Sequence, residues 1–317
     1  MLNNLKIPEI SKQIKTDEIF EALNDNYQSI APIWSSHQSE WLNSIYSSFK
    51  DHDKFLILIY LTNKTLDFYS SNLIKLTYDE FYSKESIEIE DFNITEVAKN
   101  LNIPKESARR KILELENSLV IKRGKRKIIL DRSAFPFIKP INSVKRISRF
   151  LSFFSNIIYE EKIFYKRLST LDFQDVILNN FSYIWNKYYE IQIPMLLSYK
   201  QLFGDLETFH IWGTCINNSF HRSSKVTLKK GKLEFINTLF DEKAQGINAM
   251  SVSDITGIPR ATVVRKLKKL IKLKCLYIDE KKHYKMYSNF TKKLIPTQNN
   301  VLRHLAVFSA IIYNLTL

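Results

Sequence analysis

The strongest constraint on the fold is a similarity of the chain to itself. The segment IPKESARRKILEL, residues 103–115, aligns without a gap with IPRATVVRKLKKL, residues 258–270, at a spacing of 155 residues. Further on, SRFLSFFSNIIY, residues 148–159, matches LRHLAVFSAIIY, residues 302–313, at a spacing of 154. Twice 155 nearly fills the 317-residue chain. The sequence therefore predicts a tandem duplication of one unit, and chance similarity between two lysine-rich helices is the alternative.

Two units with the same plan follow from this repeat. A thinner upstream match, Asp51 with Asp205, keeps the same order along the chain. Each unit is expected to hold N-terminal helices, a basic core and a closing amphipathic helix. The predicted boundaries are 1–160 for the first unit, with its core at about 78–132 and its closing helix at about 143–160, and 161–317 for the second unit, with its core at about 232–288 and its closing helix at about 299–314.

Within the first core, the pattern predicts helices over 78–84 and 94–101, the second capped by Asn93. Pro104 breaks that helix and suits the first turn of the next one, which places Ala108, Ile112 and Leu115 on one face. Two β-rich arms, 119–121 and 128–130, flank a turn at Gly124.

The second core repeats that order. Helices are expected over 233–240, from Asn248 to about Thr256, and over 260–272, and a hairpin is expected over 275–287. Gly257 supplies the turn between the second and third helices, where a left-handed conformation is often needed. The predicted fold class is thus mainly α with small β wings.

The positive charge is concentrated in these two cores. The chain carries a net charge of +14. Residues 93–132 hold 11 Lys/Arg against 5 Asp/Glu, and residues 248–287 hold 10 against 3, so together they carry +13 of the total. Two compact basic segments on a nearly neutral remainder indicate two electrostatic contacts with an anionic partner, nucleic acid first.

The helix–turn–helix–hairpin order, carried by IPKESARRKILELENSLVIKRGKRKIIL and by GIPRATVVRKLKKL, resembles winged helix-turn-helix transcriptional regulators of the MarR and IclR type. The two cores cover about a third of the chain. Those families usually carry one such domain per chain and pair two chains, whereas this sequence holds two copies. The resemblance implies double-stranded DNA as the partner and leaves open a monomer with an internal pseudo-twofold or a homodimer.

The residues expected to contact DNA lie on the outer faces of the third helices and on the hairpins. Arginine can grip guanine through two hydrogen bonds, and short hydroxyl side chains can reach phosphates. The helix candidates are Lys105, Glu106, Ser107, Arg109 and Arg110 in the first unit, and Arg260, Ala261, Thr262, Val264, Arg265 and Lys268 in the second. The hairpin candidates are Lys122, Arg123, Lys125, Arg126 and Lys127 in the first unit, and Lys281 and Lys282 in the second.

A sequence-specific transcriptional regulator is the preferred interpretation, reading a pseudo-palindromic site with two recognition helices. A replication initiator of plasmid or phage type is the alternative, because that class also resembles two winged domains in one chain. A structural use of winged domains is the third possibility, against which the concentrated charge argues. A membrane-surface helix at 257–270 fits less well, because its apolar face has no Trp or Phe.

Other classes find little support. With 6 glycines in 317 residues, glycine-rich phosphate loops have almost no place, and no catalytic motif is found, so we expect no enzyme, no cofactor and no metal. Two cysteines suit a reducing, cytoplasmic setting, and the N-terminus has no apolar segment typical of a secretory signal. The longest apolar run, 55–61, is too short for a bilayer. The aromatic tract 181–194 is interpreted as helical core, with a pocket for an unknown small-molecule effector as the alternative.

Overall fold

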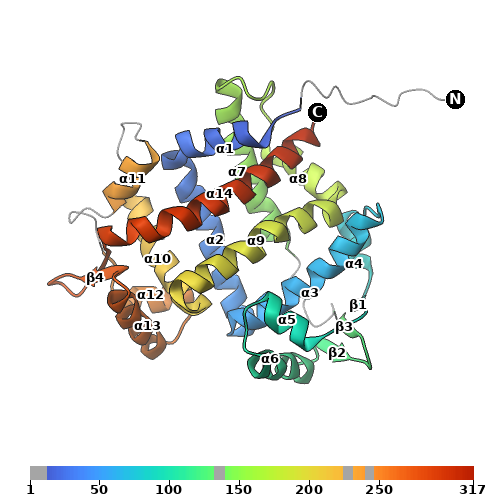
Figure 1. Cartoon of the computed structure of the whole chain (residues 1–317). Helices are drawn as coiled ribbons and strands as arrows, with labels where there is room; N and C mark the ends of the chain where they lie inside the picture. The colour runs from blue at the N-terminus through green and yellow to red at the C-terminus, as the bar shows by residue number, and fades with distance from the viewer. Residues whose placement is uncertain (1–12, 132–139, 224–230, 240–245) are drawn as a thin grey trace.

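The computed structural model describes residues 13–131, 140–223, 231–239 and 246–317 (Figure 1). It is mainly helical, with a three-stranded and a two-stranded antiparallel sheet, which confirms the predicted class of a mainly α chain with small β elements. The first half contains α1 (Thr16–Asp25), α2 (Tyr27–Phe49), α3 (His52–Ser71), α4 (Tyr78–Ser83), β1 (Ser86–Ile89), α5 (Ile94–Asn100), α6 (Lys105–Asn117), β2 (Ile121–Arg123), β3 (Ile128–Asp131) and α7 (Ile141–Glu160).

The second half follows the same order of helices. It contains α8 (Thr170–Asn179), α9 (Phe181–Phe203), α10 (Leu206–Ser223), α11 (Lys232–Leu239), α12 (Ala249–Thr256), α13 (Arg260–Lys272), β4 (Leu276–Ile278), β5 (Tyr284–Met286), the 3-10 turn η2 (Ser288–Phe290) and α14 (Thr291–Asn314). The bounds of α1 and α2 recur 154 residues later as those of α8 and α9, and the bounds of α6 recur 155 residues later as those of α13. We call 78–131 module 1 and the described residues of 232–286 module 2; α1–α3, α7–α10 and α14 form the scaffold.

The turns that end these helices also correspond. The residue after α12 is Gly257, with φ +68°, and the residue 155 positions earlier is Asn102, with φ +49°. Leu119 after α6 and Lys274 after α13, at φ +60° and +57°, form a second such pair. Left-handed backbone is adopted most readily by glycine and next by asparagine. The predicted role of Gly257 as the turn residue is therefore confirmed, and Asn102 does the same in module 1.

Both hairpins are present, and a strand that the sequence pattern did not indicate joins the first. The arms β2 and β3 pair antiparallel, but β2 begins at Ile121, so the expectation of a strand from Leu119 was wrong: Leu119 is left-handed and 76% exposed. On the other side of β3 lies β1, which pairs Ile87 with Leu130. Module 2 keeps a reduced version, in which Ile247 bridges Tyr284 of β5.

The predicted inner faces are buried. Ala108, Ile112 and Leu115 of α6 are at most 2% exposed, and Val263, Leu267 and Leu270 of α13 are at 0%. Asn93 and Asn248 cap α5 and α12 as expected, because their side-chain oxygens accept from Thr95 N at 2.8 Å and from Ser251 N at 2.9 Å.

The closing helix of the second half starts earlier than expected, at Thr291, and runs through Pro296. The expected end of the helix over 233–240 and residue 132 lie outside the described residues.

The two halves interlock in the scaffold. Helix α1 of the first half packs on α14 of the second, and α8 of the second packs on α7 of the first; likewise α3 packs on α9, and α10 packs on α2. One continuous hydrophobic core runs through both halves. Helices α7 and α14 meet through Tyr313, whose hydroxyl donates to the carbonyl of Leu151 at 2.8 Å. In Figure 1 the helices α5 and α6 of module 1 and α12 and α13 of module 2 lie along the lower edge, with the hairpins to the outer sides.

A backbone prediction follows from the turn after α12. Gly257→Ala should lower the free energy of unfolding by about 1 kcal/mol, because an L-residue is strained at φ +68°. A built Cβ would meet no atom within 4 Å at Gly257, so side-chain clashes do not contribute. Gly257→Asn, which introduces the residue found at the corresponding position 102, should lower the free energy of unfolding clearly less than Gly257→Ala. Urea unfolding of the three proteins measures this, and equal loss in both variants would contradict the backbone explanation.

Candidate nucleic-acid interface

The position of α13 depends on a carboxylate at the start of α10. Asp205 accepts from the backbone N of Thr208 at 2.8 Å and so begins that helix. The same carboxylate lies 2.7 Å from the Nζ of Lys266, a residue that is only 7% exposed. Glu207 lies 3.4 Å from Lys266, and Lys269 lies 2.8 Å from Asp205. The inner side of α13 is thus held on the scaffold by ion pairs as well as by the packing of its apolar face.

Module 1 is held in the same way. Asp51 caps α3 by accepting from Asp53 N at 2.8 Å, and it forms an ion pair with the Nζ of Lys111 on α6. Asp53 lies 3.9 Å from the same Nζ. The carboxylates stand 154 residues before Asp205 and Glu207, and Lys111 stands 155 residues before Lys266. Asp51 and Asp53 therefore both bind lysines, and Asp53 also accepts from Lys200 at 3.0 Å.

The carboxyl groups that anchor these helices are held ionised. Burial by itself would raise the pKa of Asp205, but hydrogen bonds from Lys266, Lys269 and Thr208 outweigh it and hold that pKa well below its ordinary value. For Asp51, the hydrogen bond and charge of Lys111 outweigh burial and also lower the pKa. Both carboxylates are consequently charged at neutral pH.

The outer face of α13 is free for a partner. Arg260, Ala261, Arg265 and Lys268 are exposed, and Thr262 and Val264 are half-buried. The charged side chains among them form no ion pair with any residue that the structure describes. Because Lys266 is paired with the scaffold, the predicted contact residues that remain as free cations on this helix are Arg260, Arg265 and Lys268. Lys272 in the last turn is also exposed and forms no ion pair with a described residue.

The outer face of α6 is exposed but partly self-neutralised. Arg109 Nη1 lies 3.7 Å from Glu106, and Arg110 Nε lies 3.7 Å from Glu114. Lys105 is exposed and Ser107 is half-buried. Ion pairs on an exposed helix surface are weak, so a phosphate or a base can compete for either arginine. The two helices thus offer different chemistry at corresponding positions.

The first hairpin is less available than its composition suggests. Arg123 binds Glu116 of α6, its Nε lying 2.6 Å from the carboxylate, and Lys127 forms an ion pair with Glu88 of β1. Three further cations, Lys122, Lys125 and Arg126, are exposed and form no ion pair with a described residue. Pairing along β1 is what sequence reasoning missed, because it did not foresee that strand.

The second hairpin exposes Lys281 and Lys282 at its tip. Lys282 takes φ +61°, and its backbone N donates to the carbonyl of Asp279 at 3.0 Å, which closes the turn. Asp279 also lies 3.5 Å from Lys285, so that lysine is drawn back toward the module. The tip carries two free lysines against three free cations on the first hairpin.

Residues set aside from the sequence are part of the core. His210 is fully buried: its Nε2 donates to the Oδ1 of Asn43 at 2.8 Å, and its Nδ1 lies 3.0 Å from the Nε2 of His52. Burial lowers the pKa of both histidines. In the described residues, no three His, Cys, Asp or Glu side chains come together as a metal site. Among the described helices, none combines the length and the apolar character needed to cross a membrane.

Comparisons with known proteins return no relative. The sequence matches no family model, no curated protein and no solved structure.

The anchoring ion pair predicts a large effect of removing one partner. Asp205→Ala leaves the ammonium of Lys266 buried without its main counterion, and we expect a loss of about 2–4 kcal/mol in the free energy of unfolding. Lys268→Ala on the exposed side of the same helix should change it by less than about 0.5 kcal/mol. Chemical denaturation measures both. A small effect of Asp205→Ala would show that apolar packing alone holds α13.

The same pair predicts a pH dependence. A carboxyl group whose pKa is lowered by folding stabilises the native state at pH values above its ordinary pKa, which is near 4. That stabilisation is lost as the pH falls from there toward the lower pKa of the native state. We therefore expect the stability difference between the natural chain and Asp205→Asn to be constant from pH 7 to about 5 and to shrink between about pH 4 and 3. Urea titrations at each pH measure the difference; a gap that persists unchanged at pH 3 would exclude the ionised carboxylate as its source.

Proposed function

We propose that this chain is a double-stranded DNA-binding protein with two winged helix-turn-helix modules that arose by tandem duplication, and that it acts as a transcriptional regulator. One observation carries the proposal. In each half, a helix that follows a three-residue turn is anchored from inside by the same Asp–Lys pair and presents free or weakly paired cations outward. A helix of that form is what major-groove reading requires.

The topology around each helix supports the winged plan. In module 1 the order is helix, strand, helix, helix, strand, strand, with β1 completing the sheet of the hairpin. In module 2 the bridge from Ile247 to Tyr284 stands where β1 pairs in module 1. Hairpins so placed flank the recognition helix and can contact the phosphate backbone or the minor groove.

The reciprocal packing of the scaffold supports two half-sites. Contacts of α1 with α14 and of α8 with α7 are exchanged between halves, as in the isologous interface of a twofold dimer. A pseudo-twofold places two recognition helices to read half-sites about 10 bp apart, about 34 Å along the DNA. The half-sites should differ, because Glu106 and Arg109 of α6 correspond to Ala261 and Val264 of α13.

Binding by α13 is expected to depend on Arg265. We predict that Arg265→Ala weakens binding to sequences selected from random DNA by about 1–3 kcal/mol and relaxes preference within one half-site only. Lys145→Ala, which removes an equally exposed charge from α7 of the scaffold, is the matched control and should leave affinity nearly unchanged. Fluorescence anisotropy against salt concentration gives both affinity and the number of phosphates neutralised.

Two results would overturn the proposal. Binding that does not weaken with salt is incompatible with phosphate contacts, and equal affinities for both variants would remove α13 from the interface. The location of the selected sites then separates the two roles: one site overlapping a promoter indicates a regulator, and repeated sites beside an origin indicate replication initiation.

A further inference from the structure

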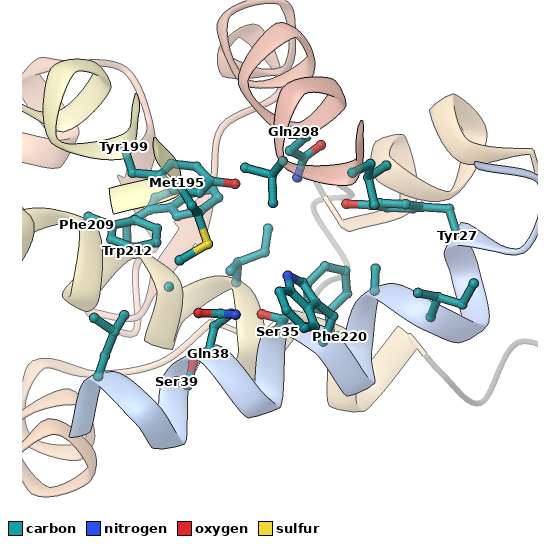
Figure 2. Close-up of a pocket in the computed structure, with 18 residues that line it drawn as sticks. Tyr27, Ser35, Gln38, Ser39, Met195, Tyr199, Phe209, Trp212, Phe220 and Gln298 are labelled. Atoms are coloured by element: carbon teal, nitrogen blue, oxygen red, sulfur yellow. The ribbon is translucent and has the colours of Figure 1, made fainter. Parts of the chain in front are cut away.

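A cavity of about 80 Å³ lies within the scaffold, between α2, α9, α10 and α14. Its walls are mostly aromatic and aliphatic, among them Trp34, Met195 and Phe209 (Figure 2). Among the described residues, no Asp, Glu, Lys, Arg or His side chain lines it. Ser35, Ser39 and Gln298 on its rim are only partly buried, so the cavity reaches solvent beside these residues. An apolar space between helices with a few polar groups is a usual form of ligand site.

Several polar atoms in this lining have no hydrogen-bond partner within the described chain. They are Nε2 and Oε1 of Gln38, Nε1 of Trp212 and Oε1 of Gln298. Gln38 is 7% exposed and Trp212 is 3% exposed, so water reaches neither freely. Figure 2 shows the amides of Gln38, from α2, and Gln298, from α14, pointing into the space between the helices. A buried polar group without a partner costs about 1–3 kcal/mol, which a ligand with matching groups removes.

A glycine on the cavity wall points the same way. Gly213 stands inside α10, where glycine costs about 0.5–1 kcal/mol relative to alanine. A Cβ built on it would meet no atom within 4 Å, so close packing does not require the glycine. The residue 154 positions earlier, at the corresponding place in α3, is Ile59, which is buried. Likewise Ser35 corresponds to Tyr189. In both pairs the copy that lines the cavity carries the small residue, Gly213 or Ser35, and its counterpart in the other half carries a large one.

We propose that this cavity binds a small uncharged molecule with an apolar body and an amide-like edge that both donates and accepts hydrogen bonds. The lining fixes these properties. A charged ligand would be buried with no counterion, which is strongly unfavourable. The amide of Gln38 offers a donor and an acceptor side by side, and Trp212 adds a second donor, so the complementary edge is a primary or cyclic amide.

The size of the cavity limits the ligand. About 10–15 Å³ of such space holds one water molecule, so 80 Å³ holds several waters or an organic molecule of a few heavy atoms, with more extending through the rim. Small branched amides meet both limits.

The ligand site is connected to a module through α10. That helix carries Trp212 and Gly213 on the cavity wall, and it begins at the carboxylates that hold Lys266 of α13. Ligand binding in the cavity is therefore expected to change the position of α13 relative to the scaffold. This last step, unlike the binding itself, rests on the proposed DNA-binding function.

The test uses isobutyramide as the probe and isobutyrate, of the same shape but charged, as its control. In the full chain, labelled with ¹⁵N at tryptophan, millimolar isobutyramide should shift the indole N–H resonance of Trp212 saturably and leave that of Trp185, away from the cavity, in place. Isobutyrate should shift neither. Gly213→Ile, which copies Ile59, should abolish the shift.

Gly213→Ala, whose methyl group takes up part of the cavity without filling it, keeps the test decisive if the isoleucine variant unfolds: it should fold more stably and weaken binding of the probe at least threefold. A Trp212 resonance that does not saturate, or that responds equally in Gly213→Ala, would overturn the site. Because the measurement contains no DNA, its result is independent of whether the modules bind DNA. A shift of Trp212 without change in DNA affinity would overturn only the connection to α13.

Discussion

The anchoring of each basic helix by a carboxylate at the start of a scaffold helix is the interaction on which the rest of the arrangement depends. Asp205 both begins α10 and binds Lys266, so one side chain fixes the start of one helix and the orientation of another. A lysine on a helix that faces inward would otherwise be costly to bury. Because Lys266 forms its ion pair on the inner side of α13, the opposite side of the helix faces outward. The arginines on that outer side are left without partners among the described residues.

The two anchors are connected through the core. His52 directly follows Asp51, and it lies 3.0 Å from His210 of α10, the helix that Asp205 precedes and caps. Burial lowers the pKa of His52 to about 4, so this contact is made between neutral rings at neutral pH. Helices α3 and α10 are thus tied together near their starts, and the charged groups of both ion pairs act on the pKa of His52. The spacing between the modules is consequently set by a packed core and not by a linker.

Local features of this fold were predictable from sequence, and non-local ones were not. The caps at Asn93 and Asn248, the turn at Gly257 and the inward spacing of Val263 and Leu267 depend on residues within a few positions of one another, and all four were correct. Strand β1 was missed because SIEI is short and pairs with residues about forty positions later. The ion pair of Lys111 joins residues 60 positions apart, and composition counts that lysine as a free cation.

The candidate interface shows the same division. The exposed residues of α6 and α13 follow from helical periodicity, which placed Arg109 and Arg265 outward. Charge counting failed on the first hairpin, because Arg123 and Lys127 are bound by Glu116 and Glu88. The alignment of Asp51 with Asp205 was the one sequence signal for the two Asp–Lys ion pairs. An acid and a lysine that both recur in a repeat, far apart in sequence, can indicate that the two residues form an ion pair.

Holding both modules in one chain has a physical consequence for recognition. Two identical subunits must present identical helices, whereas two copies in one chain keep the anchor and change the outer face independently. Here both ion pairs retain the same acid and the same lysine, while Glu106 is replaced by Ala261 and Arg109 by Val264 at the corresponding positions of the second copy. Since the second contact forms within one molecule, its effective concentration is set by the rigid scaffold and not by the amount of protein. For the proposed DNA-binding function, this means that one chain would bind two unlike half-sites together at concentrations where separate monomers would leave the weaker half-site empty.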